Sequence, residues 1–222
     1  MNGLSFTFHG ESLTALGSGA LFWPAQSLLC ISDLHLGRTE RIARHGGQII
    51  PPYENSDTLK KLEDHINALS PKTVMCLGDS FDDLASVNAL TEAETDWITR
   101  LQAGREWIWI EGNHDPAPLN LGGTHLQSYS AETLVFRHIA TSDGQGEISG
   151  HYHPKLSVAA RGRRITRPAF VYDEARLILP AFGTYTGGMS LNRAPLSEMF
   201  LNPSVILTGP SPRRINTHSA AN

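Results

Sequence analysis

Three short apolar runs in the first half of the chain each end in a cluster of polar, chemically reactive side chains. The runs SLLCIS (27–32), TVMCL (73–77) and EWIWI (106–110) pass into the motifs DLH, GDSFDD and EGNHD. Short uninterrupted apolar runs are typical of strands buried on both faces of a sheet. Polar groups that follow the carboxyl ends of such strands meet at one edge. We therefore expect one edge of one sheet to collect reactive side chains.

The segments between these runs predict helices, whereas the second half of the chain predicts strands. Residues 37–46, 55–69 and 91–103 have helical patterns, with Asn55 or Ser56 and Thr91 as expected N-caps of the last two. From about residue 124 onward, short apolar runs and tight turns indicate a β meander. We predict an α/β (α+β) fold with two stacked sheets and helices outside. One domain is expected over 1–207, with a polar, frayed tail over 208–222.

The composition is that of an ordinary globular protein. The 222 residues are 40% hydrophobic and 18% charged, with a formal net charge of −4, so a nucleic-acid partner would need a local basic patch. The two cysteines, Cys30 and Cys76, lie in apolar runs and predict buried, reduced thiols. The N-terminal segment lacks a signal-peptide pattern, and no apolar run approaches the roughly 18 residues of a transmembrane helix. A cytoplasmic location is expected.

Histidines gather at the predicted strand ends. In GEISGHYHPK (146–155), His151 and His153 are two residues apart and would face the same side of a strand, and His138 follows LVFR. With His35 and His114, five of the ten histidines lie next to carboxylates at strand ends. Carboxylate and imidazole donors together suit two divalent ions that share a bridging group, with Mn²⁺ expected first and Fe or Zn²⁺ as alternatives.

The ordered set DLH, GDSFD, GNHD, H and GHYH resembles the calcineurin-like metallophosphoesterase superfamily from residue 33 to 153. This resemblance implies a four-layer sandwich of two mixed sheets flanked by helices, and hydrolysis of phosphoesters by a metal-bridging hydroxide. It implies that one metal is held by Asp33, His35 and His153, and the other by Asn113, His138 and His151, with Asp79 bridging. His114 would stabilise the phosphoryl group or protonate the leaving oxygen, and we place Asp82 beside it among the catalytic residues.

A closer resemblance extends over almost the whole chain. The stretches DLHLGR, PPYENSDTL, LGDSFDD, GREWIWIEGNHDPAP, GEISGHYHP, RGRRITRPAF and LPAFGTYTGG are similar to the PdeM family, the ligase-associated DNA damage response endonucleases. The resemblance implies single-stranded or damaged DNA as substrate. It also implies an ATP-dependent DNA ligase, a DEXH helicase and an exonuclease-like protein as partners in DNA repair.

Several interpretations remain open at this level. His125 competes with His138 as the ligand of the second metal. Arg38 would meet a substrate phosphate or be an ordinary helix arginine, and Asp83 would cap a helix or accept a hydrogen bond near the site. The Gly-rich stretch FGTYTGG (182–188) would lie near the site or form a simple turn. A basic cluster would bind the DNA backbone or form a solvated hairpin; it comprises Arg161, Arg163, Arg164 and Arg167.

The function also has two alternatives. One is a phosphodiesterase or phosphatase of small molecules, such as cyclic nucleotides, which the negative net charge mildly favours over DNA. The other is a metal-bound scaffold that binds repair partners and does little chemistry. The complete set of predicted ligands favours an enzyme over this scaffold.

Overall fold

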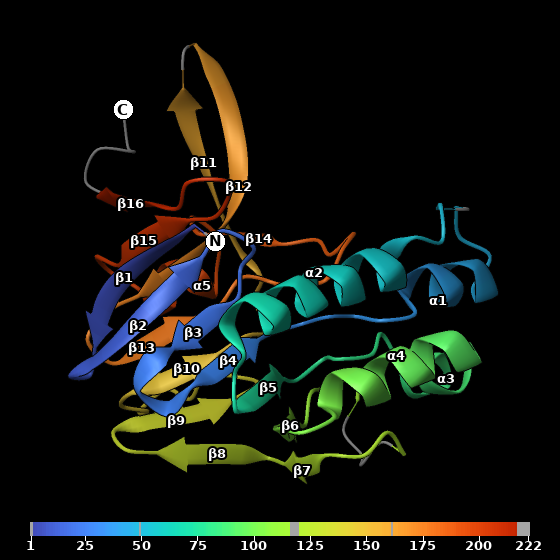
Figure 1. The fold of residues 1–222 in the computed structure, drawn as a ribbon. Helices are drawn as coiled ribbons and strands as arrows, with labels where there is room; N and C mark the ends of the chain where they lie inside the picture. Colours follow the sequence, from blue (N-terminus) through green and yellow to red (C-terminus); the bar gives the residue numbers. More distant parts are fainter. Residues whose placement is uncertain (1, 49, 116–119, 161, 217–222) are drawn as a thin grey trace.

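The computed structural model describes residues 2–48, 50–115, 120–160 and 162–216. Its first sheet has seven strands arranged in sequence order, antiparallel from the first to the fourth and parallel from the fourth to the seventh (Figure 1). The strands are β1 Gly3–Phe8, β2 Glu11–Leu16, β3 Leu21–Trp23, β4 Leu28–Ile31, β5 Thr73–Leu77, β6 Glu106–Ile110 and β7 Thr124–Leu126.

The second sheet is mixed. Its order is β14-β11-β12-β13-β10-β9-β8, with β15 on β12 and β16 on β15. The strands are β8 Ser128–Ala131, β9 Leu134–Arg137, β10 Glu147–Ser149, β11 Pro154–Ala160, β12 Arg163–Tyr172, β13 Arg176–Ile178, β14 Met189–Ser190, β15 Ser204–Leu207 and β16 Arg213–Asn216. Strands β9, β10 and β13 pair in parallel, so the expected meander is wrong for this part of the chain.

Helices α1, α2 and α4 lie where the periodic segments predict them, whereas the sequence does not predict the short helices α3 and α5. Between strands of the first sheet, helices make the crossovers that parallel pairing requires, because a tight turn cannot connect parallel strands. Figure 1 shows α1 to α4 together on one side of the molecule. The helices are α1 Arg38–Arg44, α2 Glu54–Leu69, α3 Leu84–Asn88, α4 Glu92–Gln102 and α5 Leu196–Met199, with a 3₁₀ turn, η1, at Pro24–Gln26.

The predicted caps are confirmed in one case and wrong in the other. Thr91 caps α4 and forms a capping box with Glu94. Helix α2 instead begins at Glu54, with no side-chain cap. The side chain of Asn55 is used elsewhere: its Oδ1 accepts from Gly37 N at the start of α1, and its Nδ2 donates to Glu94 of α4. Asn55 therefore ties three helices together instead of capping its own.

Two cores hold the layers together. Alternate residues of the buried strands face opposite cores, which explains their uninterrupted apolar runs. Cys30 and Met75 face the core between the two sheets, where they meet Phe136 and Phe170. The intervening residues face α2 and α4; they are Leu29, Ile31, Val74 and Cys76. A smaller cluster with Leu196 of α5 covers the outer face of the second sheet. This layering confirms the α/β sandwich of two mixed sheets.

The structure differs from the expectation of a frayed tail over 208–222. Residues 213–216 form β16, which pairs antiparallel with β15. The polar sequence RRIN conceals this strand because only one of its residues is apolar. The last six residues of the expected tail lie outside the described part of the chain. In the described ranges, no helix has both the length and the apolar character needed to cross a membrane.

Candidate metal centre

The predicted ligands follow the carboxyl ends of five strands. Asp33 and His35 come after β4, Asp79 after β5, and Asn113 after β6. The second sheet supplies the remaining ligands through the segments that follow β9 and β10; these are His138, His151 and His153. The site is therefore assembled where the ends of both sheets meet.

The first group of side chains contains Asp33, His35 and His153. Asp33 Oδ1 lies 3.0 Å from His153 Nε2, and the two Nε2 atoms of His35 and His153 are 3.4 Å apart. One donor atom from each residue lies within 4.8 Å of the others, so the three can hold one metal ion. Asp33 and His35 are buried, whereas His153 is half-buried.

The second group contains Asp79, His138 and His151, with Asn113 beside them. His138 Nε2 lies 3.2 Å from Asp79 Oδ2, 3.0 Å from Asn113 Oδ1 and 3.3 Å from His151 Nδ1. Asp79, His138 and His151 again satisfy the spacing of donors around one ion. This is the division of ligands that the family resemblance implies.

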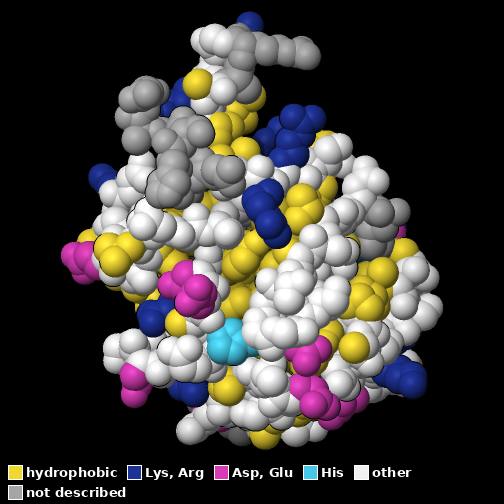
Figure 2. Space-filling model, turned by 90° about the vertical axis from the view of Figure 1, so that its left-hand side faces the viewer, with side chains coloured by type: hydrophobic (Ala, Val, Ile, Leu, Met, Phe, Trp, Pro, Cys, Tyr) yellow, Lys and Arg dark blue, Asp and Glu magenta, His cyan; other side chains and the backbone are white. Residues whose placement is uncertain are grey.

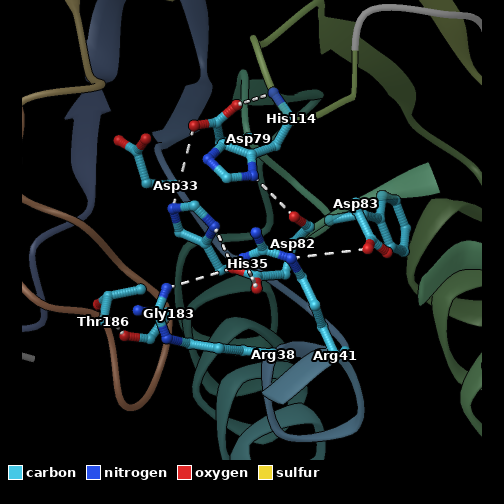
Figure 3. Close-up of polar contacts among 12 residues, drawn as sticks. Asp33, His35, Arg38, Arg41, Asp79, Asp82, Asp83, His114, Gly183 and Thr186 are labelled. Atoms are coloured by element: carbon cyan, nitrogen blue, oxygen red, sulfur yellow. Dashed lines mark hydrogen bonds and ion pairs between the residues drawn. The ribbon is translucent and has the colours of Figure 1, made fainter. Parts of the chain in front are cut away.

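Asp79 lies between the two groups. Its Oδ2 is 3.2 Å from His138 Nε2 and 4.0 Å from His35 Nε2. Its Oδ1 accepts a hydrogen bond from the backbone nitrogen of His114 at 2.9 Å. Figure 3 shows this carboxylate joined to His35 on one side and to His114 on the other. One oxygen of Asp79 therefore reaches both groups, as a bridging ligand must.

The backbone at the centre is held in an unusual conformation. A left-handed backbone with positive φ occurs at five of the predicted ligands; these are Asp33, His35, Asp79, His151 and His153. Such strain persists where surrounding interactions over-determine the structure, and it concentrates at functional sites. Here the backbone nitrogens of Asp33 and His35 donate to the carbonyls of Gly78 and Asp79.

A glycine permits the tightest approach within the centre. A Cβ on Gly150 would lie 1.8 Å from Ser32 Oγ and 2.4 Å from Asp33 Oδ2. Any side chain here would therefore displace Asp33 or Ser32. The segment after β10 can reach the end of β4 only because residue 150 has no side chain.

The carboxylates of the centre are ionised at neutral pH. Burial raises the pKa of Asp33, but the contact with His153 and the charge of His138 outweigh it, so the pKa lies below its usual value. Burial also raises the pKa of Asp79, yet the contacts with His138 and the His114 backbone hold it at about 2. Asp79 in turn raises the pKa of His138 against the effect of burial. The centre therefore offers anionic oxygens beside imidazoles.

Asp82 lies behind His35, with its side chain fully buried. Its Oδ1 is 2.8 Å from His35 Nδ1 and 3.2 Å from the Arg38 guanidinium, and its Oδ2 is 3.0 Å from that of Arg41 (Figure 3). His35, Asp82 and His114 also satisfy the donor spacing for a metal. A cation there would compete with two guanidinium groups for one carboxylate, so we do not count this as a third site. Asp82 faces His35 rather than the space between the two groups.

His114 lies beside the first group but belongs to neither the first nor the second group of predicted ligands. Its ring is edge-on to that of His35, with centroids 5.2 Å apart, and its Nδ1 is 2.7 Å from the carbonyl oxygen of Asp82. A carbonyl oxygen only accepts hydrogen bonds, so His114 Nδ1 carries a proton. Its Nε2 is then the nitrogen that can bind or release a further proton.

The structure separates the two candidate histidines of the second group. His138 is buried in the group, as described above. His125 lies in β7, where its ring stacks on Trp109 with the two ring planes 20° apart. It belongs to none of the three groups of potential ligands found among the described residues.

The remaining predicted residues lie around the centre or far from it. The Arg38 guanidinium is paired with Asp82, and Asp83 caps α3 through a 2.8 Å hydrogen bond from Ser86 N. The Gly-rich stretch packs against the centre, since Gly183 N donates to the Asp33 carbonyl at 3.1 Å. Arg163, Arg164 and Arg167 lie on the β11–β12 hairpin, and Arg161 falls outside the described residues.

Sequence reasoning misses Asp115, the last residue of the EGNHD motif. Its carboxylate accepts hydrogen bonds from four backbone nitrogens, at 2.7 to 3.2 Å; the donors are Asp79, Ser80, Phe81 and Gly112. It therefore fixes the loop after β5 to the loop after β6. The only sequence feature that points to Asp115 is its position directly after Asn113 and His114. The sequence alone does not distinguish a buried aspartate that binds backbone nitrogens from one that binds a metal.

The two groups fit a pair of divalent ions. Each combines imidazole nitrogens with at least one carboxylate oxygen, which suits Mn²⁺, Fe or Zn²⁺ better than Ca²⁺ or Mg²⁺. The donor atoms of each group converge, and the carboxylates between them are charged at neutral pH.

Comparisons with known proteins agree with this geometry. The sequence matches the model of the calcineurin-like phosphoesterase family over residues 27–177. A search of curated proteins gives no significant match. Among solved structures, the crystal structure of Pseudomonas putida nuclease MPE is similar, with a TM-score of 0.72 and 26% sequence identity over 93% of this chain and 96% of that one. This chain therefore belongs to the calcineurin-like phosphoesterase family.

Proposed function

We propose that this protein is a dinuclear-metal-dependent phosphodiesterase that cleaves DNA internally. The observation that carries the proposal is the position of Asp79, one oxygen of which faces both groups of potential ligands. This arrangement is suited to two ions that act on one phosphoryl group. The similarity to a structure named as a nuclease supports a nucleic-acid substrate.

The residues would divide the work as follows. Asp33, His35 and His153 would hold one ion, Asn113, His138 and His151 the other, and Asp79 would bind both. Two ions bound here would lower the pKa of a water molecule and offset the negative charge that develops on the phosphoryl oxygens. Mn²⁺ is the proposed metal because it accepts both oxygen and imidazole donors.

His114 would serve the leaving group. Hydrolysis of a phosphodiester breaks the bond between phosphorus and one alcohol oxygen, and that oxygen must gain a proton. His114 Nδ1 donates to the Asp82 carbonyl, which orients the ring and leaves Nε2 as the nitrogen that delivers the proton. Loss of such a general acid typically lowers rates by about 10²–10⁴-fold.

The cellular setting is a further part of the proposal. The similarity of the motifs to the PdeM family favours DNA repair in the cytoplasm, on single-stranded or damaged DNA. An ATP-dependent ligase, a DEXH helicase and an exonuclease-like protein are the proposed partners. Co-purification with an Asp79→Asn variant would test for a complex of these proteins. The variant should retain the partners if their binding does not require catalysis.

The deciding experiment compares three substrates in the presence of Mn²⁺: circular single-stranded DNA, bis-p-nitrophenyl phosphate and p-nitrophenyl phosphate. We expect the circle to be nicked and the diester to be hydrolysed, with both activities lost in Asp79→Asn and strongly reduced in His114→Ala. Diester hydrolysis with intact DNA would replace the nuclease by a phosphodiesterase of small molecules. Wild-type rates in both variants with metal bound would overturn the assignment of the site.

A further inference from the structure

A small pocket adjoins the candidate metal centre and carries positive charge. Its volume is about 170 Å³, and one wall is His153 of the first metal group. Two lysines from distant parts of the chain line it, Lys61 from α2 and Lys155 from β11. Neither lysine forms an ion pair with a carboxylate among the described residues. The pocket thus places next to a predicted metal ligand two ammonium groups that lack a direct ion pair in the described ranges.

Lys61 is held in place without a direct ion pair to a carboxylate in the described part of the chain. Its ammonium group donates to the carbonyl oxygen of Phe182 and lies 4.0 Å from the centroid of the Phe182 ring. Burial lowers the pKa of Lys61 to about 8, although the charge of Asp57 on the same helix acts in the opposite direction. Such a group retains unused donors, and an anion in the pocket would restore the interactions that burial removes.

Lys155 reaches the same pocket because a glycine makes room for it. A Cβ on Gly188 would lie 2.4 Å from Lys155 Cε and 2.5 Å from the His153 carbonyl oxygen. Lys155 begins the β11–β12 hairpin, two residues after His153. The Gly-rich stretch therefore closes the pocket over Lys155, while Thr184 N of the same stretch donates to Thr58 of α2 at 3.0 Å.

The hairpin extends one polar face away from this pocket. Cross-strand partners share a face, so Lys155 and Pro168 lie with Ser157 and Thr166, and farther out with Arg164. The hydroxyls of Ser157 and Thr166 are 2.7 Å apart on this face. Leu156, Val158 and Ile165 lie on the opposite face, together with Arg167. The three described arginines of the cluster are therefore divided between two faces, Arg164 on one and Arg163 and Arg167 on the other.

The hairpin projects from the body of the molecule in Figure 1. Figure 2 shows the left-hand side of Figure 1, where several Lys and Arg side chains lie in the upper part of the molecule and the Asp and Glu side chains lie lower. We propose that the Lys61–Lys155 pocket binds a phosphate of a polynucleotide strand, next to the phosphodiester at the metal centre, and that the strand continues along the polar face toward Arg164. This inference rests on the proposed nuclease function. It explains how a protein of net charge −4 would bind DNA, through a local basic track.

The test uses Lys155→Met and Lys61→Met, which keep an unbranched side chain of nearly the same length but remove the charge. Lys60→Met is the matched control, because Lys60 is an exposed neighbour on α2 that pairs with Asp64. With Mn²⁺, the ratio of kcat/KM for a single-stranded oligonucleotide to that for bis-p-nitrophenyl phosphate should fall about tenfold or more in each pocket variant. The ratio should stay at the wild-type value in Lys60→Met.

Binding provides a second readout that does not depend on turnover. Fluorescence anisotropy of the labelled oligonucleotide in the presence of Ca²⁺ measures the affinity of the protein for the oligonucleotide. Repeating the measurement at several salt concentrations gives the salt dependence of that affinity. Removal of one phosphate contact should reduce the slope of log K against log[salt] by about 0.7. At the hairpin tip, Arg164→Gln should weaken binding more than Arg163→Gln, because the two arginines lie on opposite faces.

The outcomes separate the inference from the proposed function. If the wild-type protein cleaves no nucleic acid, the nuclease proposal fails. If it cleaves the oligonucleotide and Lys155→Met matches Lys60→Met in both ratio and salt slope, the pocket is not a phosphate site. Equal losses on both substrates would also overturn the inference, since the lysine would then support the metal centre. If Lys61→Met fails to fold, the Lys155→Met variant alone tests the pocket, because Lys155 is only half-buried.

Discussion

Nδ1 of His35 lies 2.8 Å from Oδ1 of Asp82, while Nε2 of the same ring faces Asp79 and His153. An imidazole that binds metal through one nitrogen usually places the other against a carboxylate, which fixes the ring and strengthens it as a donor. Two arginines hold Asp82 from the other side. Helix α1 therefore orients His35 without contributing a ligand of its own.

This relationship predicts the effect of Asp82→Asn. We expect metal affinity to fall about 10- to 100-fold, because His35 loses the carboxylate that orients it. Titration with Mn²⁺ by calorimetry measures the change directly. Asp83→Asn is the matched control, since Asp83 also contacts Arg41 but caps α3 instead of facing His35. A metal affinity in Asp82→Asn equal to that of the control would show that Asp82 has no role in orienting His35.

Metal binding should raise the thermal stability of the protein. The two groups bring buried carboxylates and imidazoles together, and an ion that binds only the folded state stabilises it by about 2.7 kcal/mol at 100 times its Kd. For a chain of this size the increase in Tm is roughly 5–10 °C. Differential scanning calorimetry with Mn²⁺ and with EDTA tests this. Asp79→Asn should show a much smaller increase, and a full increase in that variant would argue against a bridging carboxylate.

The sequence predicts which side chains lie together at the centre where these side chains follow strong apolar strands. Asp33, Asp79 and Asn113 all lie within three residues of the end of such a run, and the parallel pairing of β4, β5 and β6 brings them together. The pattern fails where strands are short or polar. The sequences of the three-residue strands β10 and β13 do not indicate whether the two strands pair in parallel or antiparallel. Their parallel pairing depends on tertiary contacts that cannot be identified from the sequence.

The lysine pocket shows a second limit of sequence reasoning. Lys61 occupies a helix position that a periodic pattern assigns to solvent, next to the apolar stripe of Leu59 and Leu62. It becomes enclosed only because the stretch around Phe182 folds over α2. Lys155 likewise needs Gly188, which is distant in sequence. Neither contact follows from local spacing, so neither lysine stands out until the chain is folded.

Glu147 is predicted to stabilise the segment that follows His138. Its buried carboxylate lies 2.8 Å from Arg137 Nε and accepts hydrogen bonds from Thr141 N and Thr141 Oγ1, each at 2.8 Å. Because Glu147→Ala leaves these partners unpaired, we expect a loss of about 3 kcal/mol in the free energy of unfolding. Urea denaturation measures it. The exposed Glu132→Ala should change stability by no more than about 0.5 kcal/mol, and an equally small effect of Glu147→Ala would refute this role.

Cys30 and Cys76 should remain unreactive in the folded protein. Both are fully buried, and burial raises the pKa of each thiol, so almost no nucleophilic thiolate is present at neutral pH. The two residues lie in neighbouring strands but face opposite cores, Cys30 between the sheets and Cys76 toward the helices. A disulfide between them would require one strand to turn over. We expect iodoacetamide to label neither cysteine in native buffer and both in urea, as measured by mass spectrometry. Rapid native labelling, or an oxidised species with an internal disulfide, would contradict the buried, opposed placement of the two thiols.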